Sequence, residues 1–120
     1  MYLGWKKDEP ALVRGVETIS KWGPSKSDMY FNYYATQVMR HHGGPLWDKW
    51  NKTMRDHLVA TQEMGKGQCD NTGSWNMGAG HGARVGGRLY NTALATMILE
   101  VYYRHMPIYA QQAAEDDFPL

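Results

Sequence analysis

The chain has 120 residues, of which 42% are hydrophobic and 21% are charged, a composition typical of one globular domain with a single core. A net charge of +1 provides little electrostatic attraction to nucleic acid, so we expect no nucleic-acid partner. The longest mostly apolar run, Ala93 to Leu99, is far shorter than the ~20 residues that span a bilayer, so we expect no transmembrane segment.

Aromatic residues, methionines and glycines are the informative part of the composition. Five Trp, eight Tyr and eight Met residues suit close helix packing or an apolar ligand cavity. Eight of the 13 glycines fall between Gly65 and Gly87, which predicts a long connection. The single cysteine, Cys69, excludes an intrachain disulfide. Residues 1–8 lack the apolar core of a signal peptide, and the sequence indicates no compartment.

The first half of the chain predicts two helices. Asp8-Glu9-Pro10 is a helix-start signal, and Gly23-Pro24 ends this first helix. Asp28 is the expected cap of the second helix, which Gly43-Gly44-Pro45 ends. One stripe of the second helix is mostly apolar and predicts a packed face, formed by Phe31, Tyr34, Ala35, Val38, Met39 and His42.

The second half predicts two longer helices separated by coil. The third helix runs from about Leu46 to Gln62 and has one face in water, and residues 63–87 are predicted as coil. The fourth helix runs from about Arg88 to His105. Its segment Thr92 to Leu99 carries no charge, so we expect it to be buried on all sides. The sequence therefore predicts an all-α fold of four to five helices with one long Gly-rich loop, a domain over residues 1–110 and a polar acidic tail over residues 111–120.

Five residues around the Gly-rich loop have the order of a known repeat: Arg55, Leu58, Gln62, Gly73 and Trp75. They resemble the QW repeat of the prenyltransferase and terpenoid-cyclase family, in which a Gln is followed by Gly-x-Trp. Gly86-Gly87 before an apolar helix looks like the opening of an inner helix of this family. Over about residues 4–109 the chain most resembles the C-terminal portion of bacterial prenyltransferase/squalene-oxidase-type repeat proteins, of the squalene–hopene cyclase type.

This resemblance implies an α/α toroid, of which the chain would form a partial ring of helical hairpins. The third helix would belong to the outer ring and the fourth to the inner ring, with an apolar cavity inside. The motif would act as a structural clamp, because Gln62 would satisfy backbone groups at a helix end and Trp75 would stack over it. The rest of a toroid, or self-association, would cover the inner helix. Ten residues separate Gln62 from Gly73, a longer gap than is usual in the family.

The function expected from these features is that of a structural or binding module with an apolar, aromatic-lined concave face, within a longer chain. Tyr33, Tyr34, Trp75 and Tyr90 are candidates for the wall of a site for an isoprenoid or another apolar ligand. The simpler interpretation is that the tyrosines pack in the core and at its rim. One alternative is the C-terminal part of an isoprenoid cyclase or prenyltransferase whose catalytic acid or metal site lies upstream. Another is a protein-binding domain of the same fold, as in macroglobulin-like proteins.

The sequence offers no catalytic residue. The Asp-x-Asp-Asp acid motif of squalene-type cyclases is absent, and Ala114 to Asp117 matches only its last two positions, in a polar tail. The order Cys69-Asp70 differs from the Asp-x-Cys of zinc-dependent prenyltransferases. His57 and His81 could in principle join Cys69 and Asp70 around a metal ion. A single Cys with scattered His residues is not the spacing of a metal site, so the sequence predicts neither a metal nor a cofactor.

Basic residues surround the start of the fourth helix. His81, Arg84 and Arg88 are candidates for binding an anion, because backbone amides and cations at a helix start attract phosphate. The simpler interpretation is a flexible loop whose arginines are solvated.

Overall fold

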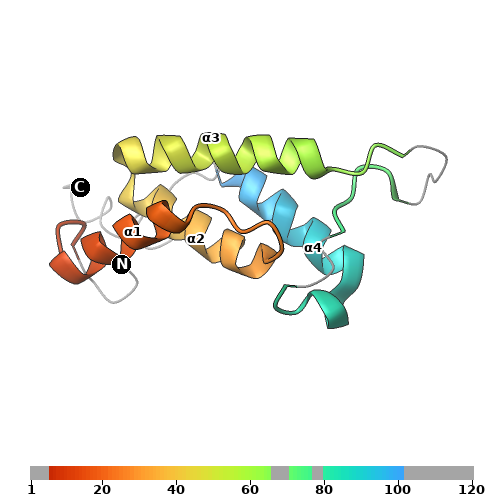
Figure 1. Ribbon diagram of the computed structural model, residues 1–120, viewed down its shortest axis with the longest axis horizontal. Coiled ribbons are helices and arrows are strands. Elements are labelled where there is room, and N and C mark those ends of the chain that lie inside the picture. Colours follow the sequence, from red (N-terminus) through yellow and green to blue (C-terminus); the bar gives the residue numbers. More distant parts are fainter. Residues whose placement is uncertain (1–5, 66–70, 77–79, 102–120) are drawn as a thin grey trace, which may run out of the picture.

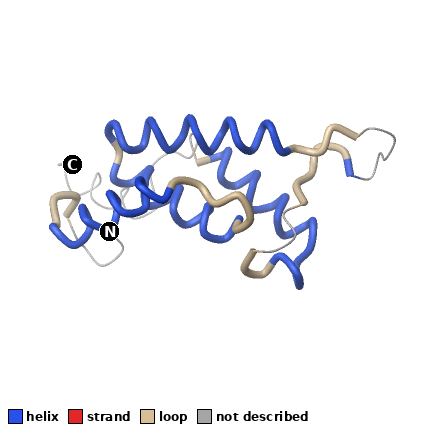
Figure 2. The backbone as a smooth tube through the Cα atoms, viewed as in Figure 1, coloured by secondary structure: helices blue, strands red, loops and turns tan. Residues whose placement is uncertain are grey.

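The computed structural model describes residues 6–65, 71–76 and 80–101. This part of the chain contains four α-helices and no strand, which confirms the predicted all-α class (Figures 1 and 2). The helices are α1 (Pro10–Trp22), α2 (Met29–His42), α3 (Gly44–Thr61) and α4 (Ala83–Glu100). The predicted domain boundary at residue 110, the acidic tail and any fifth helix lie outside the described residues.

The helix ends follow the local signals in the sequence. Pro10 stands in the first turn of α1, where its missing N–H leaves no bond unmade. The Asp28 carboxylate caps α2 by accepting a hydrogen bond of 3.0 Å from the Phe31 amide. Gly23 and Gly43 follow α1 and α2 with φ of 70° and 76°, a region that side chains rarely adopt. These positions were predicted correctly because each depends on neighbouring residues alone.

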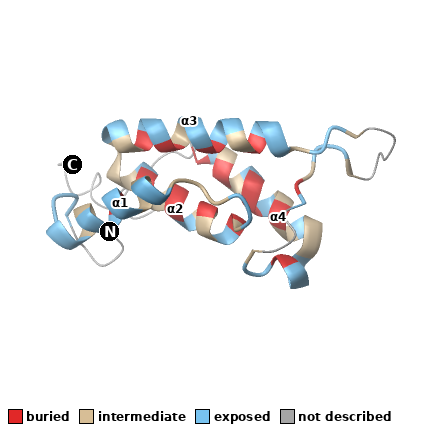
Figure 3. Ribbon diagram, viewed as in Figure 1, coloured by how far each residue is buried: buried red, intermediate tan, exposed pale blue. Residues whose placement is uncertain are grey.

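Helix α2 is the centre of the bundle. It packs against α4, α3 and α1, and Figure 1 shows α3 running along one side of α2 and α4. Buried side chains line the facing sides of the helices (Figure 3). The core they form consists of Val16, Met29, Ala35, Met39, Trp47, Trp50, Met54, Leu58, Trp75, Leu94, Ala95, Ile98 and Val101.

A buried polar network joins α2 to its neighbours. The Asn32 side chain is 0% exposed and holds the loop before α2: its Oδ1 accepts from the Ser25 amide at 2.7 Å, and its Nδ2 donates to the Ser25 carbonyl at 2.8 Å. The indole of Trp50 in α3 donates to the Thr36 hydroxyl at 2.9 Å. Buried polar groups that are paired in this way fix the register of helices as well as their contact.

Helix α4 begins earlier than the sequence predicts. The expected coil up to Gly87 is wrong for residues 83–86, which form a helical turn before a kink. At the kink Gly87 has φ 59° and ψ −149°, a conformation that essentially only glycine adopts. The regular part of α4 therefore starts at Arg88, as predicted. The predicted end at His105 lies outside the described residues.

The expectation that Thr92 to Leu99 is buried on all sides is wrong within the described part of the chain. Leu94, Ala95 and Ile98 are buried, but Ala93 and Thr96 are exposed. Leu89, one turn before them, is 81% exposed. The physical reason is that α4 packs mainly on α2, along one side, and single exposed apolar residues are common on protein surfaces.

Candidate functional site

The end of α3 is held by the indole of Trp75. This side chain is 4% exposed, and its Nε1 donates to the Leu58 carbonyl at 2.8 Å. Leu58 lies in the last turn of α3, where carbonyls have no partner within the helix. One side chain therefore both fills the core and satisfies a polar group at the helix end.

The loop after α3 is closed by a second group of hydrogen bonds. Gln62 Nε2 donates to the Gly73 carbonyl at 2.9 Å. The Glu63 amide donates to the Ser74 carbonyl at 2.9 Å, and the Gly73 amide donates to the Glu63 carbonyl at 2.8 Å. Positions 62–63 and 73–74 are thus side by side, which fixes where the chain returns to the bundle.

The same loop is also fastened to α4. The Trp75 amide donates to the Thr92 hydroxyl at 3.2 Å. Arg88 Nη1 donates to the Ser74 hydroxyl at 2.9 Å. We call the group formed by Leu58, Gln62, Gly73, Ser74 and Trp75, with its bonds to Arg88 and Thr92, the loop clamp. It joins the end of α3 to the regular part of α4.

Four of the five residues of the predicted motif meet in the loop clamp, and Arg55 does not. Arg55 is exposed on α3 and contacts the neighbouring Asp56 at 3.3 Å. The resemblance implied that Gln62 bonds to the helix end and that Trp75 stacks over it, and the structure differs from this arrangement. Trp75 makes the bond to the helix end, while Gln62 bonds to the loop.

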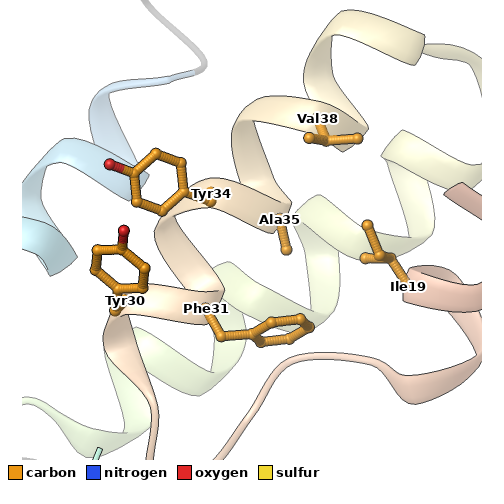
Figure 4. A pocket seen from close by; sticks show the side chains of 6 residues that line it. All are labelled: Ile19, Tyr30, Phe31, Tyr34, Ala35 and Val38. Carbon is orange, nitrogen blue, oxygen red and sulfur yellow. The ribbon is translucent and has the colours of Figure 1, made fainter. Parts of the chain in front are cut away.

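An open apolar groove lies between α1 and α2. Its volume is about 340 Å³, and none of the described side chains that line it is charged. Figure 4 shows the lining side chains, five from α2 and one from α1: Tyr30, Phe31, Tyr34, Ala35, Val38 and Ile19. The sequence placed Phe31, Ala35 and Val38 on the apolar stripe of this helix but did not indicate that Ile19 completes a groove beside it.

The four residues of the predicted aromatic wall have different surroundings. Tyr34 lines the groove. The Tyr33 ring meets the Tyr34 ring edge-on, with centroids 5.1 Å apart. Trp75 belongs to the loop clamp. The Tyr90 ring lies against Gly82, where an added Cβ would come within 2.9 Å of the ring. Tyr30, absent from the predicted wall, contacts Tyr34 with centroids 4.7 Å apart.

The aromatic end of the groove joins two distant segments. The His81 ring, just before α4, lies 4.8 Å from the Tyr30 ring between centroids. Beside it, Gly80 packs on the backbone before α2, so closely that an added Cβ would meet the Ser27 carbonyl oxygen and the Asp28 Cα. Desolvation and the Asp28 carboxylate raise the pKa of Tyr90 on the same side. The loop before α4 is therefore docked on the start of α2.

Gly80→Ala is expected to lower the free energy of unfolding by about 1–3 kcal/mol, since the added methyl group meets backbone atoms that cannot rotate away. Gly15→Ala is the matched control. Gly15 lies within α1 with open space around it, so alanine there should stabilise the chain by up to about 1 kcal/mol. Urea unfolding followed by circular dichroism measures both changes. Equal stabilities of the two variants would contradict the docked position of Gly80.

The residues considered for anion or metal binding make separate contacts. His81 lies on Tyr30, Arg88 donates to Ser74, and Arg84 is exposed. Among the described residues, no group of three or more His, Cys, Asp or Glu side chains is placed to hold a metal ion. Cys69 and Asp70 lie outside those residues.

In the described part of the chain, no helix has the length and apolar character needed to cross a membrane. Searches of protein-family models, of curated proteins and of solved structures gave no match to this chain. The loop clamp and the groove are therefore the two features of the structure that bear on function.

Proposed function

We propose that the chain is a helical binding module whose groove between α1 and α2 holds one apolar hydrocarbon chain. The composition of the groove carries the proposal, since its described lining consists of Ile, Phe, Ala, Val and two Tyr side chains, none of them charged. A volume of about 340 Å³ lies at the lower end of the range of small-molecule sites, which are mostly apolar. Aromatic and branched aliphatic side chains gain free energy by removing a hydrocarbon from water, in proportion to its area.

The resemblance to terpenoid-cyclase repeats supports an isoprenoid as the hydrocarbon and a toroid segment as the architecture. Both are part of this proposal. In it, the loop clamp is the structural element that joins α4 to the end of α3, and the groove is the binding element. The alternative of the C-terminal part of an isoprenoid cyclase or prenyltransferase, with its catalytic acid or metal site elsewhere in a longer chain, stays a prediction.

Geraniol, a short isoprenoid alcohol, is a suitable probe. Titrated into the labelled protein, it should shift amide signals of α1 and α2 around Ile19, Phe31 and Val38. Val38→Asp should weaken this binding at least tenfold, because an ionised carboxylate would face the hydrocarbon. Val59→Asp is the matched control, since Val59 is 64% exposed on α3, away from the groove.

Circular dichroism must first show that both variants are helical. Val38 is partly buried, so Val38→Thr is a milder second variant that keeps the shape and adds a hydroxyl. Shifts confined to other helices, or equal affinities of the Val38 and Val59 variants, would refute the groove as the binding site.

A further inference from the structure

Helix α4 has an uncharged side that faces away from the bundle. Leu89, Ala93 and Thr96 are exposed there, and we call them the α4 stripe. Their spacing of four and three residues places them on one side of an α-helix. The buried residues of the same segment occupy the opposite side, toward α2: Asn91, Leu94, Ala95 and Ile98. None of the stripe residues lines the groove between α1 and α2, so the stripe is independent of the proposed function.

The α4 stripe can be buried without leaving a polar side-chain atom unpaired. Leu89, which is 81% exposed, and Ala93 have apolar side chains. The Thr96 hydroxyl donates to the Thr92 carbonyl at 2.9 Å within the helix, and this bond would persist in a contact. Single exposed apolar residues are common, but three neighbours of this kind form a continuous surface that gains free energy when covered.

The sizes of the stripe residues suit a second copy of the same helix running in the opposite direction. Leu89 is four residues before Ala93, and Thr96 is three residues after it. In an antiparallel pair centred on Ala93, each large Leu89 therefore meets the smaller Thr96 of the other copy. The two Ala93 side chains face each other, and their small size lets the helix axes approach to the lower end of the usual 8–10 Å.

The two ends of the helix carry opposite charges. Arg84 is exposed in the turn that opens α4, and Glu100 is exposed at its last residue. Because they lie nine residues before Ala93 and seven residues after it, an antiparallel pair brings Arg84 of each copy toward Glu100 of the other. A parallel pair would instead place like charges and like ends of the helix dipoles together, which is unfavourable.

We infer that the α4 stripe is an interface between two copies of this chain, packed antiparallel about a twofold axis at Ala93. The same surface serves both copies, as in most homodimers. One pair of helices is small beside the ~1,200–2,000 Å² of stable interfaces, so the dimer should be weak and reversible. The contacts between Arg84 and Glu100 should make it tighter at low salt.

Sedimentation equilibrium of the full 120-residue chain tests the interface, under reducing conditions that prevent Cys69 from linking two copies. Between about 10 µM and 1 mM, the wild-type chain should pass from monomer to dimer. Leu89→Asp should weaken the dimer at least tenfold, because it places a charge in the apolar contact. Val59→Asp is the matched control, since Val59 is 64% exposed on α3, and it should dimerise like the wild type.

Charge reversal tests the antiparallel arrangement. Glu100→Arg places two positive charges together at each end of the pair and should weaken the dimer about threefold or more. Adding Arg84→Glu restores opposite charges and should recover the wild-type affinity. The two positions are separated by about 20 Å or more along one helix, so recovery cannot come from a contact within one chain.

A wild-type chain that stays monomeric throughout this range overturns the inference. A Leu89→Asp variant that dimerises as tightly as the Val59→Asp variant does so as well. If Leu89→Asp instead lowers the unfolding midpoint of a monomer in urea, another part of the same chain covers the stripe, and a second copy is excluded. If Arg84→Glu fails to recover the affinity lost in Glu100→Arg, the antiparallel arrangement is wrong.

Discussion

Replacing Trp75 with alanine is expected to lower the free energy of unfolding by about 3–5 kcal/mol. The indole is 4% exposed, so the change opens a large cavity in the core. It also removes the 2.8 Å hydrogen bond to the Leu58 carbonyl at the end of α3. Urea unfolding monitored by circular dichroism at 222 nm gives the change directly, since the signal comes from the helices rather than from one indole.

Two variants separate the contributions. Trp75→Phe keeps an aromatic ring but removes the 2.8 Å bond to the Leu58 carbonyl, which then keeps only the longer 3.4 Å bond from the Thr61 hydroxyl, and should have a smaller effect of about 1–3 kcal/mol. Trp22→Ala changes a side chain that is 71% exposed and should stay within about 1 kcal/mol of the wild type. If Trp75→Ala and Trp22→Ala were equally stable, the loop clamp would have no role in holding the fold.

Replacing Asn32 with leucine is expected to lower the free energy of unfolding by about 2–4 kcal/mol. Leucine keeps the branching at Cγ but has no polar atom, so the Ser25 amide and carbonyl each lose a hydrogen bond below 3 Å, and the bulkier methyl groups add to the loss. Since Asn32 is 0% exposed, water does not reach the position to replace either bond. The amide hydrogen of Ser25 should also exchange faster with solvent, a local signal that global unfolding does not produce alone.

Asn76→Leu is the control for this substitution, because Asn76 is exposed after the loop clamp. Its stability should stay within about 0.5 kcal/mol of the wild type. The backbone carbonyl of Asn32, which accepts from Thr36 at 2.7 Å, is unchanged in the leucine variant, so the contact between Thr36 and Trp50 should persist. A leucine variant as stable as the wild type would mean that Ser25 finds other partners.

Local signals predicted the elements well because short-range chemistry decides where a helix begins and ends. Asp28 can cap α2 whatever the rest of the chain does, and Gly23 and Gly43 permit a backbone that other residues resist. The turn at residues 83–86 was missed because Gly86, with Gly82 and Gly87 on either side of the turn, disfavours a helix. It forms nevertheless, packed beside the Tyr90 ring, which an added Cβ at Gly86 would meet. That contact joins residues four apart across the kink at Gly87, and the kink is what the sequence pattern did not predict.

The candidate site was predictable only in part. The spacing of Leu58, Gln62, Gly73 and Trp75 resembles a QW repeat, which singled out this loop from the sequence. In the structure, hydrogen bonds join Gln62 to Gly73 and Trp75 to Leu58. The aromatic wall did not emerge as one surface, since Trp75 is committed to the end of α3 and Tyr90 to the turn before the kink. Aromatic side chains serve cores and binding sites equally well, so their number does not distinguish the two uses.

By itself, the sequence determined the all-α class, the order of the helices and the apolar stripe on residues 31–38. These follow from periodicity and from caps, which are properties of one segment at a time. Only the tertiary structure decided that α2, rather than α4, is central, that α4 keeps an exposed side, and that Ile19 turns a helix face into a groove. The reason is physical: an apolar stripe gains the same free energy from any apolar partner, so the pairing of helices depends on the whole chain.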